Sequence, residues 1–279
     1  MKFLTKFIIT CLALLAFSIT YRIAQSPQNK NSVELYFFDV GQGDAALIQK
    51  DHYQILIDGG PDDKVLSELG SVMPLGDKKI EKIILTHPHA DHITGLNQVL
   101  ERYEVGEIVS TAVLSSSNQY LEFLNKIKDL NKTIIIPGIG QKDSVFENGS
   151  IEYFWPGDNF VQKEAKNLNN TSVVFRFCYS NDCALFMGDL ELDGQAQMFS
   201  ANESRLSDFQ SGIIKVAHHG SKNGSDSRLY EIVKPINAVI SVGIDNQYGH
   251  PSPETLKLLQ DFNIKIFRTD KDQTVKFSL

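Results

Sequence analysis

The chain has 279 residues, 42% of them hydrophobic, so it can bury one large core or two modest ones, and nothing in its composition suggests repeats or low complexity. Its 27 basic and 34 acidic residues give a formal net charge of −7, which excludes a global positive field that would hold a polyanion. We therefore expect one domain of catalytic size and no stable nucleic-acid complex.

Residues 1–31 have the pattern of a leader in front of a folded domain, 32–279. Two lysines precede an apolar stretch at 7–20, and polar sequence with a proline follows. About 20 apolar residues span a bilayer, so this shorter stretch favours an export signal peptide, although 3–23 could serve as an uncleaved membrane anchor. An ordinary buried helix is the third interpretation. We expect an extracytoplasmic protein, secreted or anchored to the membrane by this N-terminal segment.

The first half of the domain changes from a meander to an alternation of strands and helices. VELYFFDV (33–40), AALIQ (45–49) and YQILID (53–58) predict strands separated by the GQGD and KDH turns. PDDKVLSELG then predicts a helix that begins with proline and acidic residues and ends at Gly70. Strands are predicted next at 82–86, 107–113 and 132–136, and helices at 92–103 and 120–130.

The second half repeats this order after a seam near 137–148. Its predicted strands are 151–155, 172–179, 183–187, 213–217, 238–243 and 264–268, and its predicted helices are 195–200, 227–234 and 254–262. Two such halves make an α/β fold. Sheets with helices on one face and each other on the opposite face would form a four-layer sandwich, but the pattern also fits other α/β layerings.

The stretch THPHADHITG (86–95) places three histidines and an aspartate in six consecutive positions, although the chain has only 7 histidines. Pro88 biases His87 toward an extended conformation, so His87 and His89 can turn to one side, whereas Asp91 and His92 begin a helix. Four such groups converge more easily on two neighbouring ions than on one. Histidine with carboxylate suits zinc, manganese or iron rather than calcium. Surface histidines without a common task are the disfavoured alternative.

Cys178 and Cys183 flank the sequence Tyr-Ser-Asn-Asp. If Ser180 and Asn181 form a two-residue turn, the cysteines face each other as a non-hydrogen-bonded pair with Cα atoms about 4.5 Å apart. An exported protein meets an oxidising compartment in which they can bridge. A disulfide and two buried free thiols are both compatible with this geometry.

Several motifs together resemble a known family. THPHADH resembles the metal-binding motif of the metallo-β-lactamase fold, and ILIDGG, FMGDL and KVAHHGS stand in the order that this fold requires. The resemblance runs from about residue 33 to the C-terminus. It implies a four-layer αββα sandwich, in which Asp58 braces the histidine loop.

Within that superfamily, FFDVGQGDAALI, NNTSVV, HHGSKNGS, VISVG and YGHPSPETL closely resemble the hydrolase domain of ComEC-type competence proteins, which are DNA-uptake channels. Similar modules occur as detached, exported hydrolases, including phosphorylcholine esterases of the bacterial surface. This chain has no channel helices and resembles the detached form.

The resemblance implies a role for each site residue. His87 and His89 would bind a first metal, Asp91 and His92 a second, and Asp189 both. The remaining ligand of the second metal would be His219, because His218 points the opposite way if the strand continues; the two roles could be reversed. The implied metal ligands are His87, His89, Asp91, His92, Asp189 and His219, and the implied catalytic residues are Asp91, His218 and His250.

Weaker signals surround these residues. Without the resemblance, Asp189 could be an ordinary helix N-cap. The glycines of GQGD (41–44) could be only turn residues, whereas the resemblance puts Asp39 and Asp44 beside the metal rim, with Asp44 in support. His250 and the Ser221-Lys222 pair have the groups that hold a phosphate.

One departure from the fold's pattern concerns the first metal. No histidine occurs between His92 and His218, where the fold normally supplies one, and NNTSVV stands in its place. Asn169, Asn170 or a water could complete the first site and shift its preference from zinc toward manganese. A dead enzyme that keeps the fold is the other interpretation.

The resemblance and the residues together predict an exported hydrolase with two divalent metal ions, Zn or Mn. A metal-bound hydroxide would attack a phosphodiester substrate, single-stranded DNA among the candidates. The alternatives are hydrolysis of a lactone or other acyl ester at the same site, and a non-enzymatic accessory role in DNA uptake. A β-lactamase proper is disfavoured by the missing histidine.

Overall fold

The computed structural model describes residues 32–279, of which Val33–Leu279 form one compact unit. The predicted leader, 1–31, lies outside the described residues. No helix among residues 32–279 combines the length and the apolar character needed to cross a bilayer.

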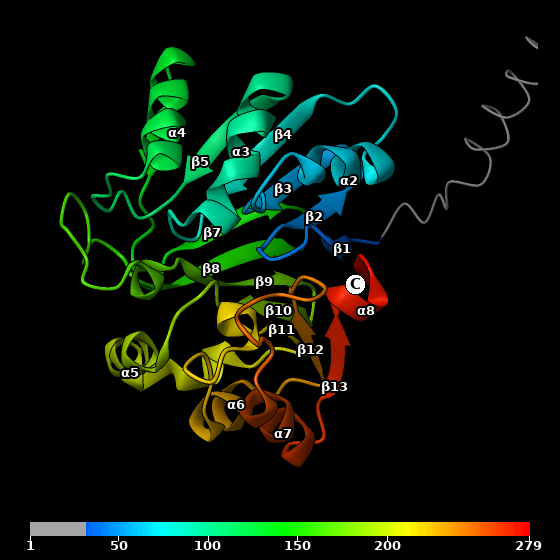
Figure 1. Cartoon of the computed structure of the whole chain (residues 1–279), viewed down its shortest axis with the longest axis vertical. Coiled ribbons are helices and arrows are strands. Elements are labelled where there is room, and N and C mark those ends of the chain that lie inside the picture. Colours follow the sequence, from blue (N-terminus) through cyan, green and yellow to red (C-terminus); the bar gives the residue numbers. More distant parts are fainter. Residues whose placement is uncertain (1–31) are drawn as a thin grey trace, which may run out of the picture. The chain divides into compact units, whose positions relative to one another are not determined.

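Two mixed sheets of seven strands each make up the interior (Figure 1). The first runs in the order β14-β1-β2-β3-β4-β5-β6 and the second in the order β13-β12-β11-β10-β9-β8-β7. In each sheet the early strands pair antiparallel and the later ones parallel, with the change at β3–β4 and at β10–β11. The change from meander to alternation in each half is therefore confirmed.

The first sheet contains β1 (Glu34–Phe37), β2 (Ala46–Lys50), β3 (Tyr53–Ile57), β4 (Lys79–Ile84), β5 (Glu104–Val109), β6 (Ile134–Ile135) and β14 (Val275–Ser278), and its helices are α2 (Lys64–Val72), α3 (Ala90–Arg102) and α4 (Asn118–Asp129). The second contains β7 (Lys142–Phe146), β8 (Gly149–Trp155), β9 (Val174–Tyr179), β10 (Asp182–Phe186), β11 (Ile213–Lys215), β12 (Asn237–Ile240) and β13 (Lys265–Arg268), with α5 (Leu192–Ala201), α6 (Ser227–Val233), α7 (Pro253–Asp261) and α8 (Thr269–Asp272). Short 3₁₀ segments are η1 (Leu168–Thr171), η2 (Glu203–Phe209) and η3 (Ala217–Gly220).

Three apolar clusters define four layers. One cluster packs α2, α3 and α4 on the first sheet, and a second packs α5, α6 and α7 on the other sheet. The third lies between the sheets, where Phe37, Phe175 and Phe186 stack, with ring centroids 5.7 and 4.8 Å apart. The inner strands of each sheet thus bury side chains on both faces, and the predicted αββα sandwich is confirmed.

Three local predictions were wrong, and one strand was not predicted. The helix after β3 does not end at Gly70 but continues to Val72, and the seam near 137–148 contains strand β7. The predicted strand 213–217 ends at Lys215, before the histidine pair. After β13, the chain returns to the first sheet as β14, which pairs with β1. The sequence of β14 is short and half-exposed, so it lacks the apolar run by which the other strands were recognised.

Candidate metal centre

The predicted site residues gather where parallel strands of both sheets end. Asp58 follows β3, His87 follows β4, Asp189 follows β10 and His219 follows β11. Asp91 and His92 lie in the first turn of α3. Carboxyl ends of parallel strands form the crevice in which open α/β sheets bind their ligands. Both sheets of this sandwich contribute strand ends to the same group of residues.

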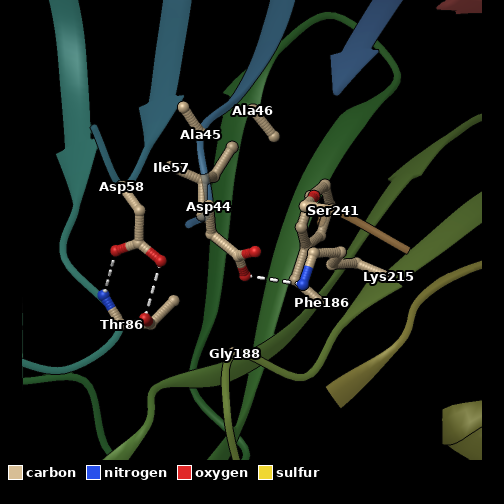
Figure 2. A pocket seen from close by; sticks show the side chains of 10 residues that line it. All are labelled: Asp44, Ala45, Ala46, Ile57, Asp58, Thr86, Phe186, Gly188, Lys215 and Ser241. Carbon is tan, nitrogen blue, oxygen red and sulfur yellow. Dashed lines mark hydrogen bonds and ion pairs between the residues drawn. The ribbon is translucent and has the colours of Figure 1, made fainter. Parts of the chain in front are cut away.

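Asp58 braces the histidine loop, as the resemblance implies. Its carboxylate accepts hydrogen bonds from the backbone nitrogen of Thr86 at 2.8 Å and from Thr86 Oγ1 at 2.7 Å (Figure 2). His92 Nδ1 lies 2.8 Å from Asp58 Oδ2. Since a carboxylate accepts and does not donate, His92 carries its proton on Nδ1 and presents Nε2 to the site.

Three glycines let the histidine helix approach this brace. The backbone nitrogen of Gly59 donates to the carbonyl of His92 at 2.7 Å, and that of Gly95 donates to the carbonyl of Gly60 at 3.1 Å. A Cβ on Gly95 would overlap the carbonyl oxygen of Gly59. The glycine pair in ILIDGG and the glycine in HITG therefore fix the position of the first turn of α3, which carries Asp91 and His92.

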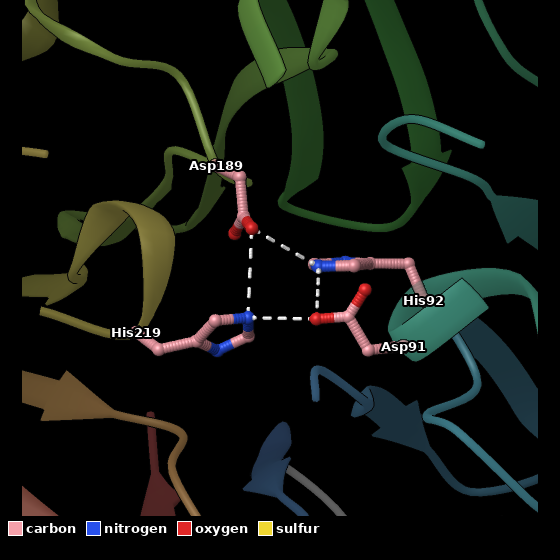
Figure 3. Close-up of side chains that lie close together, drawn as sticks. All are labelled: Asp91, His92, Asp189 and His219. Carbon is pink, nitrogen blue, oxygen red and sulfur yellow. Dashed lines mark hydrogen bonds and ion pairs between the residues drawn. The ribbon is translucent and has the colours of Figure 1, made fainter. Parts of the chain in front are cut away.

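Four donors converge at the centre, two from the first half and two from the second: Asp91, His92, Asp189 and His219 (Figure 3). Asp189 Oδ2 lies 3.3 Å from His92 Nε2 and 3.5 Å from His219 Nε2. Asp91 Oδ2 lies 3.8 Å from His92 Nε2 and 3.2 Å from His219 Nε2. Two carboxylate oxygens and two imidazole nitrogens thus surround one point.

These separations fit a divalent cation. Ligand atoms about 2.1 Å from a tetrahedral ion lie about 3.4 Å from one another, close to the distances measured here. Two of the buried atoms, His92 Nε2 and Asp189 Oδ1, have no hydrogen-bond partner. Because buried polar atoms are nearly always satisfied, these two atoms point to an ion as their partner.

The electrostatics favour a cation. Burial by itself lowers the pKa of His219, but Asp189 and Asp44 outweigh it and raise that pKa to about 10. Burial likewise opposes charge on His92, yet Asp189 and Asp91 raise its pKa well above the ordinary value. Negative charge that favours a proton on an imidazole also favours a divalent ion, and the ion displaces the protons as it binds.

His87 and His89 lie beside this group. His87 Nε2 is 3.0 Å from His89 Nδ1 and 3.9 Å from Asp189 Oδ2. Burial and the charge of His92 lower the pKa of His87 well below its ordinary value, so the ring is neutral and can act as a ligand. Among residues 32–279, however, these two histidines do not complete a group of three donor side chains within 4.8 Å.

The histidine pair after β11 does not lie on a strand, so the alternation argument for it was wrong. His218 and His219 belong to η3 and both have positive φ, 48° and 51°. Even so, His219 turns into the four-donor group, whereas His218 Nε2 stops 4.0 Å from Asp189 Oδ2. The tight left-handed turn separates two adjacent rings, as a strand would also have done.

Behind the site, the GQGD loop supports His219. Asp44 is buried; its Oδ1 lies 3.2 Å from His219 Nδ1 and its Oδ2 forms an ion pair with the buried Lys215 at 2.6 Å (Figure 2). A Cβ on Gly43 would overlap the carbonyl oxygen of Asp91, so this glycine permits a close approach and is more than a turn residue. Asp39 instead accepts a hydrogen bond from the backbone nitrogen of Gly41 and forms an ion pair with Lys64. Of the two aspartates, the contacts of Asp44 are those of a supporting residue.

The NNTSVV segment (169–174) holds the loop that contains Asp189 and Glu191, which is called the GDLE loop (188–191). Ser172 Oγ accepts from the backbone nitrogen of Asp189 at 3.0 Å, and Asn170 Oδ1 accepts from that of Glu191 at 3.2 Å. Asn169 Nδ2 donates to Glu191 Oε1 at 3.0 Å, which leaves the buried Asn169 Oδ1 without a partner. Since the oxygen of Asn170 is already engaged, Asn169 has the amide oxygen that remains available.

Glu191 and Lys215 were not singled out from the sequence. Glu191 Oε1 lies 3.2 Å from His218 Nδ1, and Ser221 Oγ lies at the same distance from that nitrogen. A signal existed for both residues: Glu191 stands two positions after Asp189, and Lys215 is a charge inside an apolar strand. A charged residue in a buried strand requires a partner, which is Asp44.

His250 lies at the opening of the site. Its ring centroid is 5.4 Å from that of His218 and 6.3 Å from that of His219. Burial and the charge of His219 lower the pKa of His250 to about 4, so the ring is neutral near pH 7. Lys222, which follows Ser221, is exposed.

Cys178 and Cys183 face each other as predicted, and of the two alternatives left open by the sequence the structure has the disulfide. Tyr179 pairs with Asp182 around a two-residue turn, and the next pair, Cys178 and Cys183, is bonded with Cα atoms 4.1 Å apart. The bond closes the β9–β10 hairpin, from which the GDLE loop leaves.

A four-layer sandwich with a histidine and aspartate cluster at the strand ends defines a class of metal-dependent hydrolases. The family model of the metallo-beta-lactamase superfamily matches residues 38–243, and this chain belongs to that superfamily. The family resemblance inferred from the motifs is therefore confirmed.

Two curated relatives match most of the chain. The chain is 26% identical over 262 residues to ComE operon protein 3 of Bacillus subtilis, with 88% of this chain and 33% of that protein covered. It is 26% identical over 271 residues to competence protein ComA of Neisseria gonorrhoeae, with 95% and 35% covered. The chain thus spans about a third of the length of these relatives.

Solved structures agree on the fold. The metallo-beta-lactamase fold protein YhfI from Bacillus subtilis superposes with a TM-score of 0.56 at 12% identity, covering 89% of this chain and 100% of that one. A diphosphatase from the PhnP family superposes with a TM-score of 0.51 at 14% identity, covering 89% and 99%.

Proposed function

We propose that the chain hydrolyses phosphodiesters, with single-stranded DNA as the substrate class, and that two divalent ions, Zn or Mn, assist the reaction. The observation that carries this proposal is the group of Asp91, His92, Asp189 and His219, in which His92 Nε2 and Asp189 Oδ1 are buried and unpaired. Buried ligand atoms without a hydrogen-bond partner support a bound ion, which the proposed reaction requires.

The second ion would be held by those four residues, and the first by His87, His89 and Asp189. The 3.0 Å between His87 Nε2 and His89 Nδ1 supports two nitrogen donors on one ion. The unpaired Asn169 Oδ1 supports an oxygen donor where the fold normally has a histidine, which favours manganese over zinc at that ion. Bound divalent ions supply Lewis acidity and polarise the phosphoryl oxygens.

The chain's own groups handle the phosphate and its protons. His218 is partly exposed, and Glu191 and Ser221 hold its Nδ1, so its Nε2 is directed toward Asp189, whose Oδ2 lies 4.0 Å away. In that position His218 would donate a proton to the leaving oxygen or hold a phosphoryl oxygen. His250 stands beside it as a neutral imidazole, and the exposed Lys222 adds a cation to the same loop.

DNA is proposed as the substrate because one of these relatives is named a competence protein, and the chain aligns with about a third of it. An extracytoplasmic location is proposed as well. The Cys178–Cys183 disulfide supports it, because such bonds persist in oxidising compartments.

The test is a substrate screen with the metal-stripped, purified full chain, reloaded with Zn or Mn. Bis-p-nitrophenyl phosphate, a single-stranded oligonucleotide, a phosphorylcholine ester and a lactone would be compared. We expect cleavage of the two phosphodiesters, with Mn at least as effective as Zn. Turnover of the lactone alone would assign the site to acyl esters, and loss of all turnover with full metal content would favour the non-enzymatic role.

A further inference from the structure

The loop after β12 presents an unusual side chain. Among the aromatic residues of 32–279, Tyr248 is the only one that is exposed, at 72%. The other phenylalanine, tyrosine and tryptophan rings of residues 32–279 are buried or half-buried. Ile244, at 71%, lies on the same loop. A single exposed apolar residue is ordinary, so the position of Tyr248 relative to the metal centre is what gives it interest.

Tyr248 lies on the solvent side of His250. Its ring is stacked on that of His250, with centroids 5.8 Å apart and planes inclined by 26°. His250 in turn contacts His218, at 5.4 Å between centroids, and His218 Nε2 lies 4.0 Å from Asp189 Oδ2. A row of three rings therefore leads from solvent to the proposed bridging carboxylate.

Hydrogen bonds of Asn246 fix the conformation of the loop that carries Tyr248. Asn246 Nδ2 donates to the carbonyl of His250 at 2.7 Å and to that of Gly243 at 3.2 Å. Asn246 Oδ1 accepts from the backbone nitrogens of Tyr248 and His250, at 3.2 and 3.0 Å. The base of the loop is tied to the GQGD turn, because Gly243 donates to Gln42 Oε1 at 3.1 Å.

We propose that the exposed face of Tyr248 stacks a nucleobase of single-stranded nucleic acid and so sets the preference of the site for that substrate class. The inference rests on the proposed function and deepens it. Every base has a π-face, so one aromatic ring at the opening binds the base next to the scissile phosphate without sequence preference. His250 backs the ring on its inner side, which leaves the outer side for the base.

The charge of the chain limits how it could hold a strand. Proteins that hold nucleic acid by its backbone use basic surfaces, and this chain carries a net charge of −7. With a weak grip on phosphates, recognition of the strand depends on contacts to the bases. A quaternary ammonium group such as choline is recognised by a cage of several aromatic rings, whereas the described residues offer one exposed ring here.

The test compares Tyr248→Ala and Tyr248→Phe in the full chain. With a short oligothymidylate as substrate, Tyr248→Ala should raise KM about 5- to 100-fold with little change in kcat, because base stacking is lost from ground state and transition state alike. Tyr248→Phe keeps the π-face and should stay within about threefold of wild type. Ile236→Ala is the matched control, since Ile236 is 70% exposed and precedes β12, at the end of the strand away from the site.

A readout independent of turnover is the fluorescence of 2-aminopurine in an oligonucleotide, measured without added metal. Stacking on Tyr248 should quench it, and the quench should disappear in Tyr248→Ala. On an oligonucleotide with an abasic site next to the scissile phosphate, wild type and Tyr248→Ala should have the same KM.

Other outcomes would overturn the inference. If kcat of Tyr248→Ala on the abasic substrate is lower than that of wild type, Tyr248 acts by positioning His250 and not by stacking a base. A rise in KM for a phosphorylcholine ester but not for oligothymidylate would assign the ring to a quaternary ammonium group. If wild type cleaves bis-p-nitrophenyl phosphate while 2-aminopurine is unquenched, this inference fails and the proposed function stands. If no phosphodiester is cleaved, the proposed function fails, and the quench alone decides the role of the ring.

Discussion

Glu191 Oε1 lies 3.2 Å from His218 Nδ1, so a carboxylate two residues after Asp189 holds the ring next to the metal centre. The amides of Asn167 and Asn169 donate to the two oxygens of this carboxylate, at 2.8 and 3.0 Å, and fix its orientation. An acceptor at Nδ1 requires the proton there, which leaves Nε2 to face the substrate.

The first prediction concerns this contact. Glu191→Gln keeps an acceptor but loses the charge, and we expect it to lower kcat about 10-fold, whereas Glu191→Ala should lower it by about 100-fold. Metal content, measured by atomic emission, should be unchanged in both. Glu231→Gln, an exposed carboxylate on α6, serves as the control. Equal activity of all three variants would show that His218 needs no partner.

The second prediction separates the adjacent histidines. His219→Ala should lose about one equivalent of metal, because its Nε2 lies 3.2 Å from Asp91 Oδ2 and 3.5 Å from Asp189 Oδ2. His218→Ala should keep its metal and slow turnover by about 10²–10⁴-fold. Metal analysis and kinetics on the two purified variants check this. The reverse pattern would exchange the roles of the two residues.

The third prediction concerns the Cys178–Cys183 pair. Mass spectrometry of the non-reduced full chain should find neither thiol alkylated, and reduction should add two alkyl groups at these positions. Because the loop closed by the bond is short, we expect its reduction to lower the free energy of unfolding by only about 2–3 kcal/mol. Complete alkylation without a reductant would contradict the pairing and would remove one support for an oxidising compartment.

Much of the site could be predicted because its residues lie in short, dense motifs. THPHADH carries four candidate ligands and HHGS carries His218 and His219, and strong apolar runs place both motifs near strand ends. The backbone of HHGS was predicted wrongly, since the left-handed turn at His218 and His219 depends on tertiary contacts, such as the bond from the His218 nitrogen to the carbonyl of Gly188. Local pattern does not contain that information.

The supporting residues were harder to predict because their partners are distant in sequence. Lys215 and Asp44 are far apart in the chain and meet only after the two halves pack. In the same way β14 joins β1 across the whole domain, with Val33 and Leu279 exchanging two backbone hydrogen bonds. Periodicity reports local structure, so it cannot identify contacts of this kind.

The last prediction tests the glycine contact that positions the histidine helix. In Gly95→Ala the new Cβ would overlap the carbonyl oxygen of Gly59, and backbone cannot move aside as a flexible side chain can. Overpacking of this kind costs about 1–3 kcal/mol, only partly offset by the better helix propensity of alanine. Because the displaced turn carries Asp91 and His92, the variant should also bind metal more weakly.

Gly70→Ala is the matched control for that substitution. Gly70 lies inside α2, and a Cβ there meets nothing within 4 Å. The free energy of unfolding of this variant should therefore rise by about 0.5–1 kcal/mol, because alanine loses less backbone entropy on folding than glycine. The variant should bind metal like wild type. Urea unfolding and metal titration of the two variants give both quantities. If Gly95→Ala proves as stable as Gly70→Ala with unchanged metal affinity, α3 is not positioned by the close approach of Gly95 to Gly59.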